Sequence, residues 1–171
     1  VRRKVAVKVL RPGIEEAFER DLKLFFWIAD MVERFQPAFR RLRLRKMVEI
    51  LEQSVSLEMD LRLEAAAAAE MGENFADDPD FDVPVIDWQR TGKRVMTQSQ
   101  VEGISLSNRE ALIEAGHDMA QISANVIRVF LHQVLRDGFF RADMHQGNLF
   151  VNAEGQLIAV DFGIMGRMDR Q

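Results

Sequence analysis

Cysteine is absent from this sequence of 171 residues. Its absence excludes a disulfide scaffold, a thiolate zinc site and a cysteine nucleophile. The sequence also lacks a secretory signal pattern at its first residues and any run of roughly 18 uncharged apolar residues that would predict a membrane span. The net charge is only −4, from 23 basic and 27 acidic residues. Because no strong positive charge is present, we expect no nucleic-acid partner.

The chain is nonetheless typical of a globular protein, with a hydrophobic content of 47%. Its first residues, "VRRKVAVKVLRPG", begin inside an expected β-strand and contain no Met. We therefore expect the chain to be part of a longer protein.

Patterns of apolar residues predict a mixed α+β organisation. The expected elements are a strand at 4–13 that ends at Pro12-Gly13, a helix at 14–36, a second long helical region at 44–75, a hairpin with arms at 83–88 and 94–98 that turns at Thr91-Gly92, a helix at 108–137, and a hairpin at 148–162 that turns at Glu154-Gly155. This order favours the α+β class with two lobes.

Asp143 and Asn148 have the D-x-x-x-x-N spacing of a kinase-type catalytic loop. In such a loop the Asp orients or deprotonates the nucleophile, and the Asn binds a magnesium ion. Asp161 begins the triplet "DFG" and would supply a carboxylate to the same ion. Mg²⁺ prefers hard oxygen ligands and keeps part of its water shell, so these two side chains and the ATP phosphates suffice.

Lys8, in "VAVK", is the candidate to contact the α- and β-phosphates of ATP. This role requires a carboxylate on a neighbouring helix to hold the lysine extended. Glu58, Asp60 and Glu64 are the candidates, and the last two share a helical face at i, i+4.

Each of these signals has an ordinary structural alternative. The lysine is also typical of a solvated strand edge, "DFG" of a turn, and the acids of the solvated face of an amphipathic helix. The order of these features along the chain distinguishes the functional interpretation from the structural one. A strand with a lysine is followed by a helix with an acid, a hairpin, a helix, the D-x-x-x-x-N loop, a second hairpin and the DFG triplet. That order favours a kinase-like protein.

At this level of detail the sequence resembles the UbiB family, also called aarF-domain or ABC1-type atypical kinases. "VAVKVLRPGIEE" is similar to the family's lysine strand, and "LEMDLRLEAAAAAEM" to its E-x-D helix. "RADMHQGNLFV" resembles the signature H-A-D-P-H-P-G-N, and "VDFG" resembles the metal-binding triplet. The resemblance covers nearly the whole chain.

The resemblance implies a protein-kinase-like, two-lobed fold, with residues 1–103 in the N-terminal lobe and 104–171 at the start of the C-terminal lobe. The first strands and the phosphate loop would precede Val1, and the rest of the C-terminal lobe would follow Gln171. We therefore expect weak or no ATP binding by this chain alone. The segment "VMTQSQVEG" would be the hinge that contacts the nucleotide, with Gln98, Ser99, Gln100 and Val101.

The family's activity is implied in the same way. We expect an ATP-dependent, Mg²⁺-dependent atypical kinase or ATPase that supports biosynthesis of ubiquinone and related isoprenoid quinones. Lipids or proteins of that pathway are the expected partners. The expected location is the cytoplasm, with peripheral contact at the inner face of a membrane.

The chain departs from the family pattern mainly in the catalytic loop. Arg141 stands where the family has His, and Met144 and Gln146 replace two prolines. The loss of both prolines is expected to loosen the loop, because proline restricts the unfolded chain.

Other functions remain open from the residues alone. Asp143 and His145 have a metal-ligand spacing, but no H-x-x-x-H pair supports a metal hydrolase, and His145 is more typical of a residue that orders the loop. A phosphotransferase of the aminoglycoside or choline kinase type uses a similar loop. A catalytically weak module that binds lipids or partners is a third alternative. The basic cluster Arg40 to Lys46 fits either an anionic lipid surface or a solvated helix start.

Overall fold

The computed structural model describes residues 3–168, without the side chains of residues 37 and 38. The chain divides into two compact units, Val9–Asp60 and Val1–Lys8 together with Leu61–Gln171. The predicted lobe boundary between residues 103 and 104 stays a prediction. Within residues 3–168, no helix is both long enough and apolar enough to cross a membrane.

The elements of the chain, in order, are β1 (Val5–Val9), α1 (Ile14–Phe35), η1 (Pro37–Leu42), α2 (Leu44–Glu58), α3 (Leu61–Asn74), β2 (Phe81–Asp82), η2 (Trp88–Arg90), β3 (Val95–Ser99), β4 (Ile104–Ser105), α4 (Arg109–Glu114), α5 (Met119–Leu131), the π-helix η3 (His132–Asp137), β5 (Phe139–Arg141), η4 (Gln146–Asn148), β6 (Leu149–Val151), β7 (Leu157–Ala159) and β8 (Met165–Arg167). The predicted mixture of helices and strands is confirmed.

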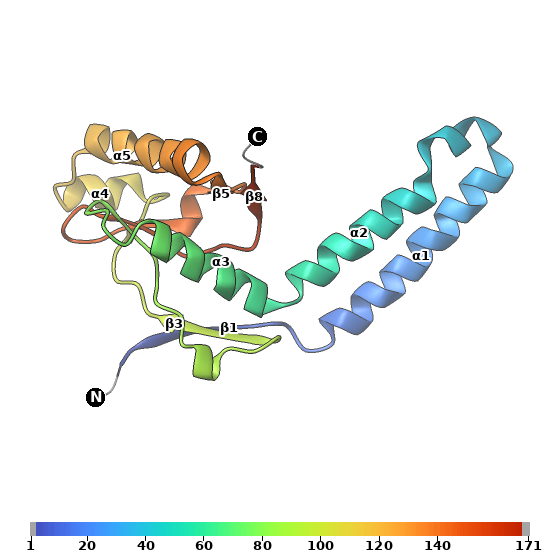
Figure 1. Ribbon diagram of the computed structural model, residues 1–171, viewed down its shortest axis with the longest axis horizontal. Coiled ribbons are helices and arrows are strands. Elements are labelled where there is room, and N and C mark those ends of the chain that lie inside the picture. The colour runs from blue at the N-terminus through green and yellow to red at the C-terminus, as the bar shows by residue number, and fades with distance from the viewer. Residues whose placement is uncertain (1–2, 169–171) are drawn as a thin grey trace. The chain divides into compact units, whose positions relative to one another are not determined.

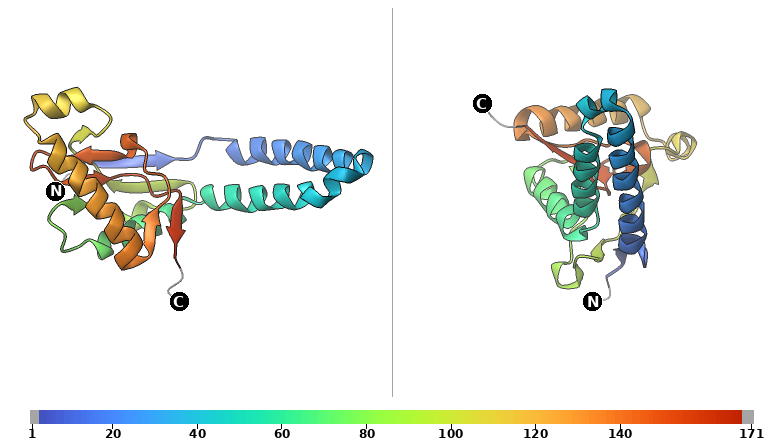
Figure 2. Two further views of the ribbon diagram at one scale, coloured as in Figure 1. Left: turned by 90° about the horizontal axis from the view of Figure 1, so that it is seen from above. Right: turned by 90° about the vertical axis from the view of Figure 1, so that its right-hand side faces the viewer.

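The unit Val9–Asp60 is a helical hairpin. Helices α1 and α2 lie side by side, and η1 joins them at one end of the pair (Figures 1 and 2). The buried residues of α1 are Leu22 and Ala29, two helical turns apart, so that a single stripe of α1 is covered. Helix α2 has no fully buried residue. The hairpin therefore leaves much apolar surface exposed.

The prediction of one continuous helical region over 44–75 was wrong. The helix ends at Glu58, and α3 begins at Leu61. The backbone N–H of Leu61 donates to the carbonyl oxygen of Lys93 at 2.9 Å instead of to a carbonyl one turn earlier. A tertiary hydrogen bond therefore ends the first helix where local helix propensity alone would continue it.

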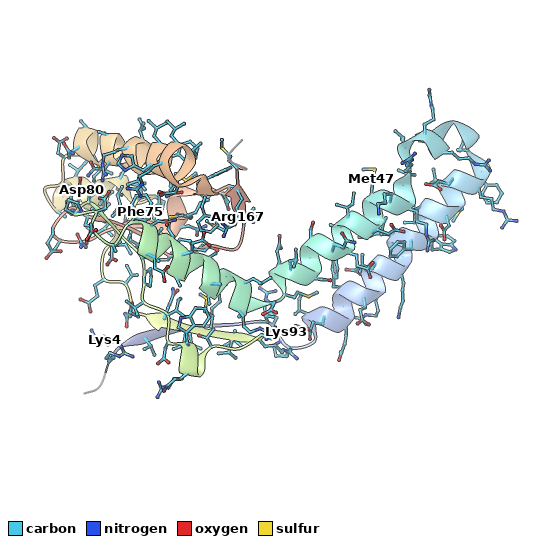
Figure 3. All side chains as sticks on the ribbon, viewed as in Figure 1. Lys4, Met47, Phe75, Asp80, Lys93 and Arg167 are labelled. Atoms are coloured by element: carbon cyan, nitrogen blue, oxygen red, sulfur yellow. The ribbon has the colours of Figure 1, made fainter. Side chains whose placement is uncertain are left out.

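Helix α3 is the central helix of the second unit. Ala65, Ala68 and Met71 on its buried face have no solvent exposure, and α3 packs against β3. The small alanine side chains allow this close approach. At the end of α3, the rings of Phe75 and Phe81 meet edge to face at 4.7 Å, and Figure 3 shows Phe75 and Asp80 at this end of the helix.

Three small sheets complete the unit. Strand β1 pairs with β3, β5 pairs with β8, and the third sheet has the order β2-β7-β6-β4. The predicted hairpin at 148–162 is confirmed as β6 and β7, which pair antiparallel with Leu149 opposite Ala159. Its turn contains Gly155 with φ of 87°, a conformation that favours glycine.

The predicted hairpin at 83–98 is correct only in part. The second arm is β3, but the first arm is irregular and includes η2. This arm still pairs with β3 at two points. Ile86 and Gln98 form an isolated β-bridge, and the N–H of Asp87 donates to the carbonyl of Thr97 at 2.8 Å. Pro84 has no N–H to donate, which disfavours a regular strand here.

The single helix predicted at 108–137 is also wrong in detail. Gly116 adopts a left-handed φ of 84° and ends α4. The Asp118 side chain then accepts a hydrogen bond from the N–H of Ala120 at 2.8 Å and caps α5. A glycine followed by a capping residue is a termination signal that the apolar stripe conceals.

Candidate active site

Lys8 and Glu64 form the central ion pair of the site. The Lys8 Nζ atom lies 2.6 Å and 2.7 Å from the two carboxylate oxygens of Glu64. Strand β1 carries the lysine, and α3 carries the glutamate. The Glu64 side chain is only 7% exposed, whereas that of Lys8 is 47% exposed. The lysine is therefore anchored from the protein interior while its ammonium group stays accessible to solvent.

The burial of Glu64 has an electrostatic cost. Desolvation raises the pKa of its carboxyl group above the ordinary value of 4.5, and the hydrogen bond and charge of Lys8 oppose this shift. The nearby charge of Asp161 raises the pKa further. A buried carboxylate in such a place is more typical of a functional site than of a stabilising contact.

Glu64 is one of the three acids considered as partners of Lys8. Glu58 lies at the end of α2 in the helical hairpin and is exposed, and Asp60 directly precedes α3. Within residues 3–168, Glu64 and Asp161 are the carboxylates within ion-pair distance of Lys8. The roles assigned to the three acids stay predictions.

Asp161 extends the cluster toward the catalytic loop. Its Oδ1 atom lies 3.8 Å from Lys8 Nζ and accepts a hydrogen bond from the N–H of Gly163 at 3.1 Å. Its Oδ2 atom is 3.4 Å from the Asn148 side-chain amide nitrogen. The next residue, Phe162, is 1% exposed. The buried ring thus anchors the triplet while the Asp161 side chain remains 41% exposed.

The β6–β7 hairpin explains why Asn148 and Asp161 meet. Asn148 directly precedes β6, and Asp161 follows β7 by two residues. The N–H of Val160 donates to the carbonyl of Asn148 at 3.1 Å and continues the strand pairing. The antiparallel register therefore brings these two side chains together, although 13 positions separate them in the sequence.

Asp143 lies in an exposed turn that its own hydrogen bonds shape. The Asp143 Oδ1 atom accepts from the N–H of His145 at 3.1 Å. The His145 Nδ1 atom accepts from the N–H of Gly147 at 3.1 Å. His145 thus orders the loop, as expected. Within residues 3–168, the Asp143 carboxylate has no hydrogen bond to Lys8, Asn148 or Asp161.

Arg141 and Gln133 are the site residues that the sequence did not identify. The Arg141 side chain is almost completely buried at 2% exposure, and its guanidinium carbon lies 5.5 Å from the ring centroid of Phe162. Its Nη2 atom donates to the carbonyl of Asp143 at 3.4 Å, and its backbone N–H donates to Gln133 Oε1 at 3.1 Å. Arg141 therefore links the catalytic loop to the DFG triplet.

Burial lowers the pKa of the Arg141 guanidinium, and the charges of Asp161 and Asp143 oppose that shift. Gln133 belongs to the π-helix η3 and is 2% exposed. A short π-helix of this kind is frequent at functional sites, but no sequence pattern predicts it. The only available signal was that Arg141 departs from the family's histidine.

The predicted hinge overlaps the end of β3, since Gln98 and Ser99 are the last two residues of this strand. Ser99 donates its backbone N–H to the carbonyl of Val85 at 2.9 Å, and Gln100 donates to the carbonyl of Lys4 at 3.3 Å. The Gln98 side-chain oxygen is buried and has no hydrogen-bond partner within residues 3–168. Val101 follows Gln100 at the end of the segment. The pairing of β3 with β1 places this segment beside the lysine strand, and contact with a nucleotide stays a prediction.

The two predicted metal ligands fit a magnesium ion in their chemistry. Asn148 and Asp161 are adjacent and supply an amide and a carboxylate, both of which carry hard oxygen donors. In the described part of the chain, no three His, Cys, Asp or Glu side chains are grouped to hold a metal ion. A site with two protein ligands suits Mg²⁺, which keeps water and phosphate oxygens as its other ligands.

This fold and this cluster of lysine, glutamate, asparagine and aspartate define a protein-kinase-like domain. The chain belongs to the ABC1 atypical kinase-like family, whose model matches residues 2–171. The chain is 39% identical to the "Probable protein kinase UbiB" of Marinobacter nauticus over 96% of its length, and 38% identical to the protein of that name from Xanthomonas oryzae over 100%. It spans only 31% and 32% of the lengths of these two relatives.

A solved structure supports the same fold. The Mycobacterium tuberculosis protein Rv3197, determined in complex with erythromycin, matches 97% of this chain with a TM-score of 0.73 and 26% sequence identity. The match covers 41% of the Rv3197 chain. The resemblance to the UbiB family is therefore confirmed, and the kinase-like fold class with it.

Proposed function

We propose that the protein binds ATP with Mg²⁺ and transfers or hydrolyses the terminal phosphoryl group. The observation that carries this proposal is the continuous series of contacts from Glu64 through Lys8 and Asp161 to Asn148. These four side chains come from four separate parts of the chain. Phosphoryl transfer depends mainly on positioning and on charge stabilisation, and this cluster supplies groups for both.

Lys8 would hold the α- and β-phosphates. Its ammonium group is half-exposed and is fixed at short distance by a carboxylate that is itself almost completely buried. An anionic phosphate oxygen can therefore approach from solvent without displacing Glu64. A lysine that is held in this way loses less conformational entropy when it binds the nucleotide.

Asn148 and Asp161 would hold the magnesium ion. The Asn148 amide now presents its nitrogen to Asp161, and rotation of that amide by half a turn would present its oxygen instead. The ion, when bound, neutralises charge on the phosphates. The Gln98 side-chain oxygen, which is buried and has no hydrogen-bond partner within residues 3–168, supports the assignment of its own segment to nucleotide binding.

Asp143 would orient the attacking group. Its side chain is exposed, and one carboxylate oxygen is engaged by the N–H of His145. The carboxylate is thereby fixed in direction but remains accessible to an acceptor hydroxyl or to water. The identity of that acceptor defines the enzyme class within phosphoryl transfer.

We further propose that the activity serves isoprenoid quinone biosynthesis, with lipids or proteins of that pathway as partners. The support for this role is the similarity to proteins named UbiB. The proposed place of action is the cytoplasm, at the inner face of a membrane where such lipids lie. Because the chain spans about a third of these relatives, the activity is proposed for the whole protein.

The test is turnover of Mg²⁺-ATP by the full-length protein, with and without a short-chain quinone analogue, and with choline or an aminoglycoside as phosphoryl acceptor. Asp161→Asn is expected to lower turnover by about a hundredfold, because it removes a carboxylate that would hold the magnesium ion. Asp77→Asn, at an exposed position outside the cluster, is the matched control and should leave turnover unchanged. Unchanged turnover in Asp161→Asn would show that the metal assignment is wrong.

A further inference from the structure

Arg167, at the end of β8, connects the segment that follows the DFG triplet to helix α3. Its Nη2 atom donates to the Oε2 atom of Glu70 at 2.5 Å, although 97 positions separate the two residues in the sequence. Glu70 lies on α3, the helix that also carries Glu64. Arg167, which Figure 3 labels, lies beside this helix. The ion pair therefore joins the helix of Glu64 to the strand that follows Asp161.

The position of Arg167 is fixed by the pairing of β8 with β5. Phe139 lies opposite Arg167 in this pair, and the guanidinium carbon of Arg167 is 4.5 Å from the centroid of the Phe139 ring, which is buried. A cation over an aromatic ring is a favourable arrangement. At the neighbouring position, Gly166, a Cβ atom would overlap the Phe140 ring. A buried ring and a closely packed strand thus hold the Arg167 side chain toward α3.

The Arg167 side chain holds α3 at a distance from the central ion pair of the site. Within residues 3–168 it makes no ion pair with Lys8 or Glu64. Helix α3 is continuous from Leu61 to Asn74, and Glu70 lies six residues, or about 9 Å, along it from Glu64. Because a helix of this length moves as one body, a displacement at Glu70 also displaces the Glu64 carboxylate from Lys8.

The position of α3 in which Glu64 meets Lys8 is opposed by part of its own interface. The Glu64 carboxylate loses water when it enters the interior, and this desolvation disfavours the charged form. Ala65 and Ala68 have no solvent exposure, but their small side chains bury less apolar area than larger residues would. A contact on another side of the helix therefore shifts the equilibrium in favour of the position in which Glu64 meets Lys8.

We propose that Arg167 and Glu70 are positioning residues, which keep α3 where Glu64 can hold Lys8. The segment after the DFG triplet thereby controls how firmly the phosphate-binding lysine is held. The Arg167 side chain is 66% exposed and that of Glu70 is 37% exposed, so that solvent screens the pair. It therefore shifts the equilibrium between the held and the displaced position of α3 by about two- to fivefold. The effect on turnover rests on the proposed phosphoryl transfer, whereas the effect on Lys8 does not.

The first test compares kcat/KM for Mg²⁺-ATP in variants of the full-length protein. Glu70→Gln and Arg167→Gln should each lower kcat/KM by about two- to fivefold, because the ion pair is lost. Arg167→Lys should retain more of the wild-type value, since lysine keeps the positive charge. The matched control is Glu73→Gln, which makes the same change in net charge on the same helix. Glu73 is exposed, and within residues 3–168 its side chain has no ion pair, so this substitution should leave kcat/KM unchanged.

The second test asks whether the effect passes through Glu64. In a Glu64→Ala background, Lys8 has lost its partner on α3, so Glu70→Gln should cause no further loss of kcat/KM. A pair that served only the stability of the fold would lower kcat/KM by the same factor in both backgrounds. The melting temperature should change little in Glu70→Gln, because an exposed ion pair contributes little to stability.

The third test does not require enzymatic activity. An amine-reactive ester labels Lys8 more slowly while its ammonium group is engaged by Glu64, and mass spectrometry measures this labelling against that of the exposed Lys23 on α1. Labelling of Lys8 should rise by up to about fivefold in Glu70→Gln and should rise further in Glu64→Ala, but not in Glu73→Gln. If these changes occur in a protein without ATP turnover, the positioning role stands and the proposed function is wrong.

Two results would overturn the proposal. One is Lys8 labelling that is unchanged in Glu70→Gln although it rises in Glu64→Ala. The other is a loss of kcat/KM in Glu70→Gln that Glu73→Gln reproduces or that persists in the Glu64→Ala background. Circular dichroism of each variant checks that the helices are retained.

Discussion

The guanidinium carbon of Arg141 lies 5.5 Å from the ring centroid of Phe162, in the buried space between the catalytic loop and the DFG triplet. The same guanidinium donates to the carbonyl of Asp143. One buried cation therefore contacts the residue next to a predicted metal ligand and the backbone of the predicted catalytic aspartate. We regard Arg141 as a positioning residue.

The Arg141→Leu substitution tests whether Arg141 acts by positioning the catalytic loop or by stabilising the fold. Within residues 3–168 no carboxylate lies within ion-pair distance of Arg141, so replacement by leucine should leave the melting temperature unchanged or raise it. Turnover by the full-length protein should fall by about tenfold, because the loop loses its link to the triplet. The concentration of Mg²⁺ for half-maximal turnover should fall, because a cation near Asp161 is removed.

Arg141→His is the matched variant. An imidazole ring can stack on Phe162 and donate to the Asp143 carbonyl, and histidine is the residue that the related signature carries at this position. We therefore expect Arg141→His to retain more turnover than Arg141→Leu. Equal loss in both variants, or a large loss of stability in both, would contradict the positioning role.

The Glu64→Gln substitution tests whether the buried Glu64 carboxylate lowers the stability of the fold, because this effect should depend on pH. Because the pKa of Glu64 is raised in the folded protein, folding favours its protonated form. The wild-type chain should gain stability relative to Glu64→Gln as pH falls through the raised pKa toward 4.5. That relative gain should be lost as pH rises through the raised pKa.

The measurement is the free energy of unfolding of both chains in denaturant from acid to neutral pH. At neutral pH the variant should be as stable as the wild type or more stable, because glutamine keeps a hydrogen-bond acceptor for Lys8 without a buried charge. A wild-type advantage that grows with pH would contradict this account of Glu64.

Gly103→Ala tests a close approach beside the predicted hinge. A Cβ atom at Gly103 would lie 2.7 Å from the carbonyl oxygen of Val151. Since this neighbour is backbone in β6, the sheet must shift, at a cost of about 1–3 kcal/mol in the free energy of unfolding. Gly92→Ala is the control, because a Cβ there meets no atom within 4 Å. Equal effects of the two substitutions on denaturant unfolding would refute the steric argument.

The sequence predicted the features that depend on local pattern or on family motif. The strand that carries Lys8, the helix α1 and the hairpin with Gly155 at its turn all follow from periodicity and turn chemistry. The motifs also selected Asn148 and Asp161, which the structure brings into contact.

The sequence could not predict features that depend on contacts between distant residues. The break before Leu61 arises from a hydrogen bond to Lys93, and the parallel pairing of β2 with β7 joins segments 76 positions apart, Phe81 with Leu157. The burial of Arg141 against Gln133 requires the π-helix that contains Gln133. A π-helix has no periodic sequence pattern from which it could be predicted. The site residues were therefore found by motif, and the residue that links them was found only in three dimensions.

The most direct test of the central claim is a double-mutant cycle on ATP binding by the full-length protein, measured by calorimetry with Mg²⁺ present. Lys8→Met and Asp161→Asn should each weaken binding by about tenfold or more, since each removes a charged contact to the nucleotide or its ion. Because the two residues serve one site, the double variant should lose clearly less than the sum of the single effects. Strictly additive effects, or ATP binding that neither substitution weakens, would contradict a single Mg²⁺–nucleotide site formed by Lys8, Asn148 and Asp161.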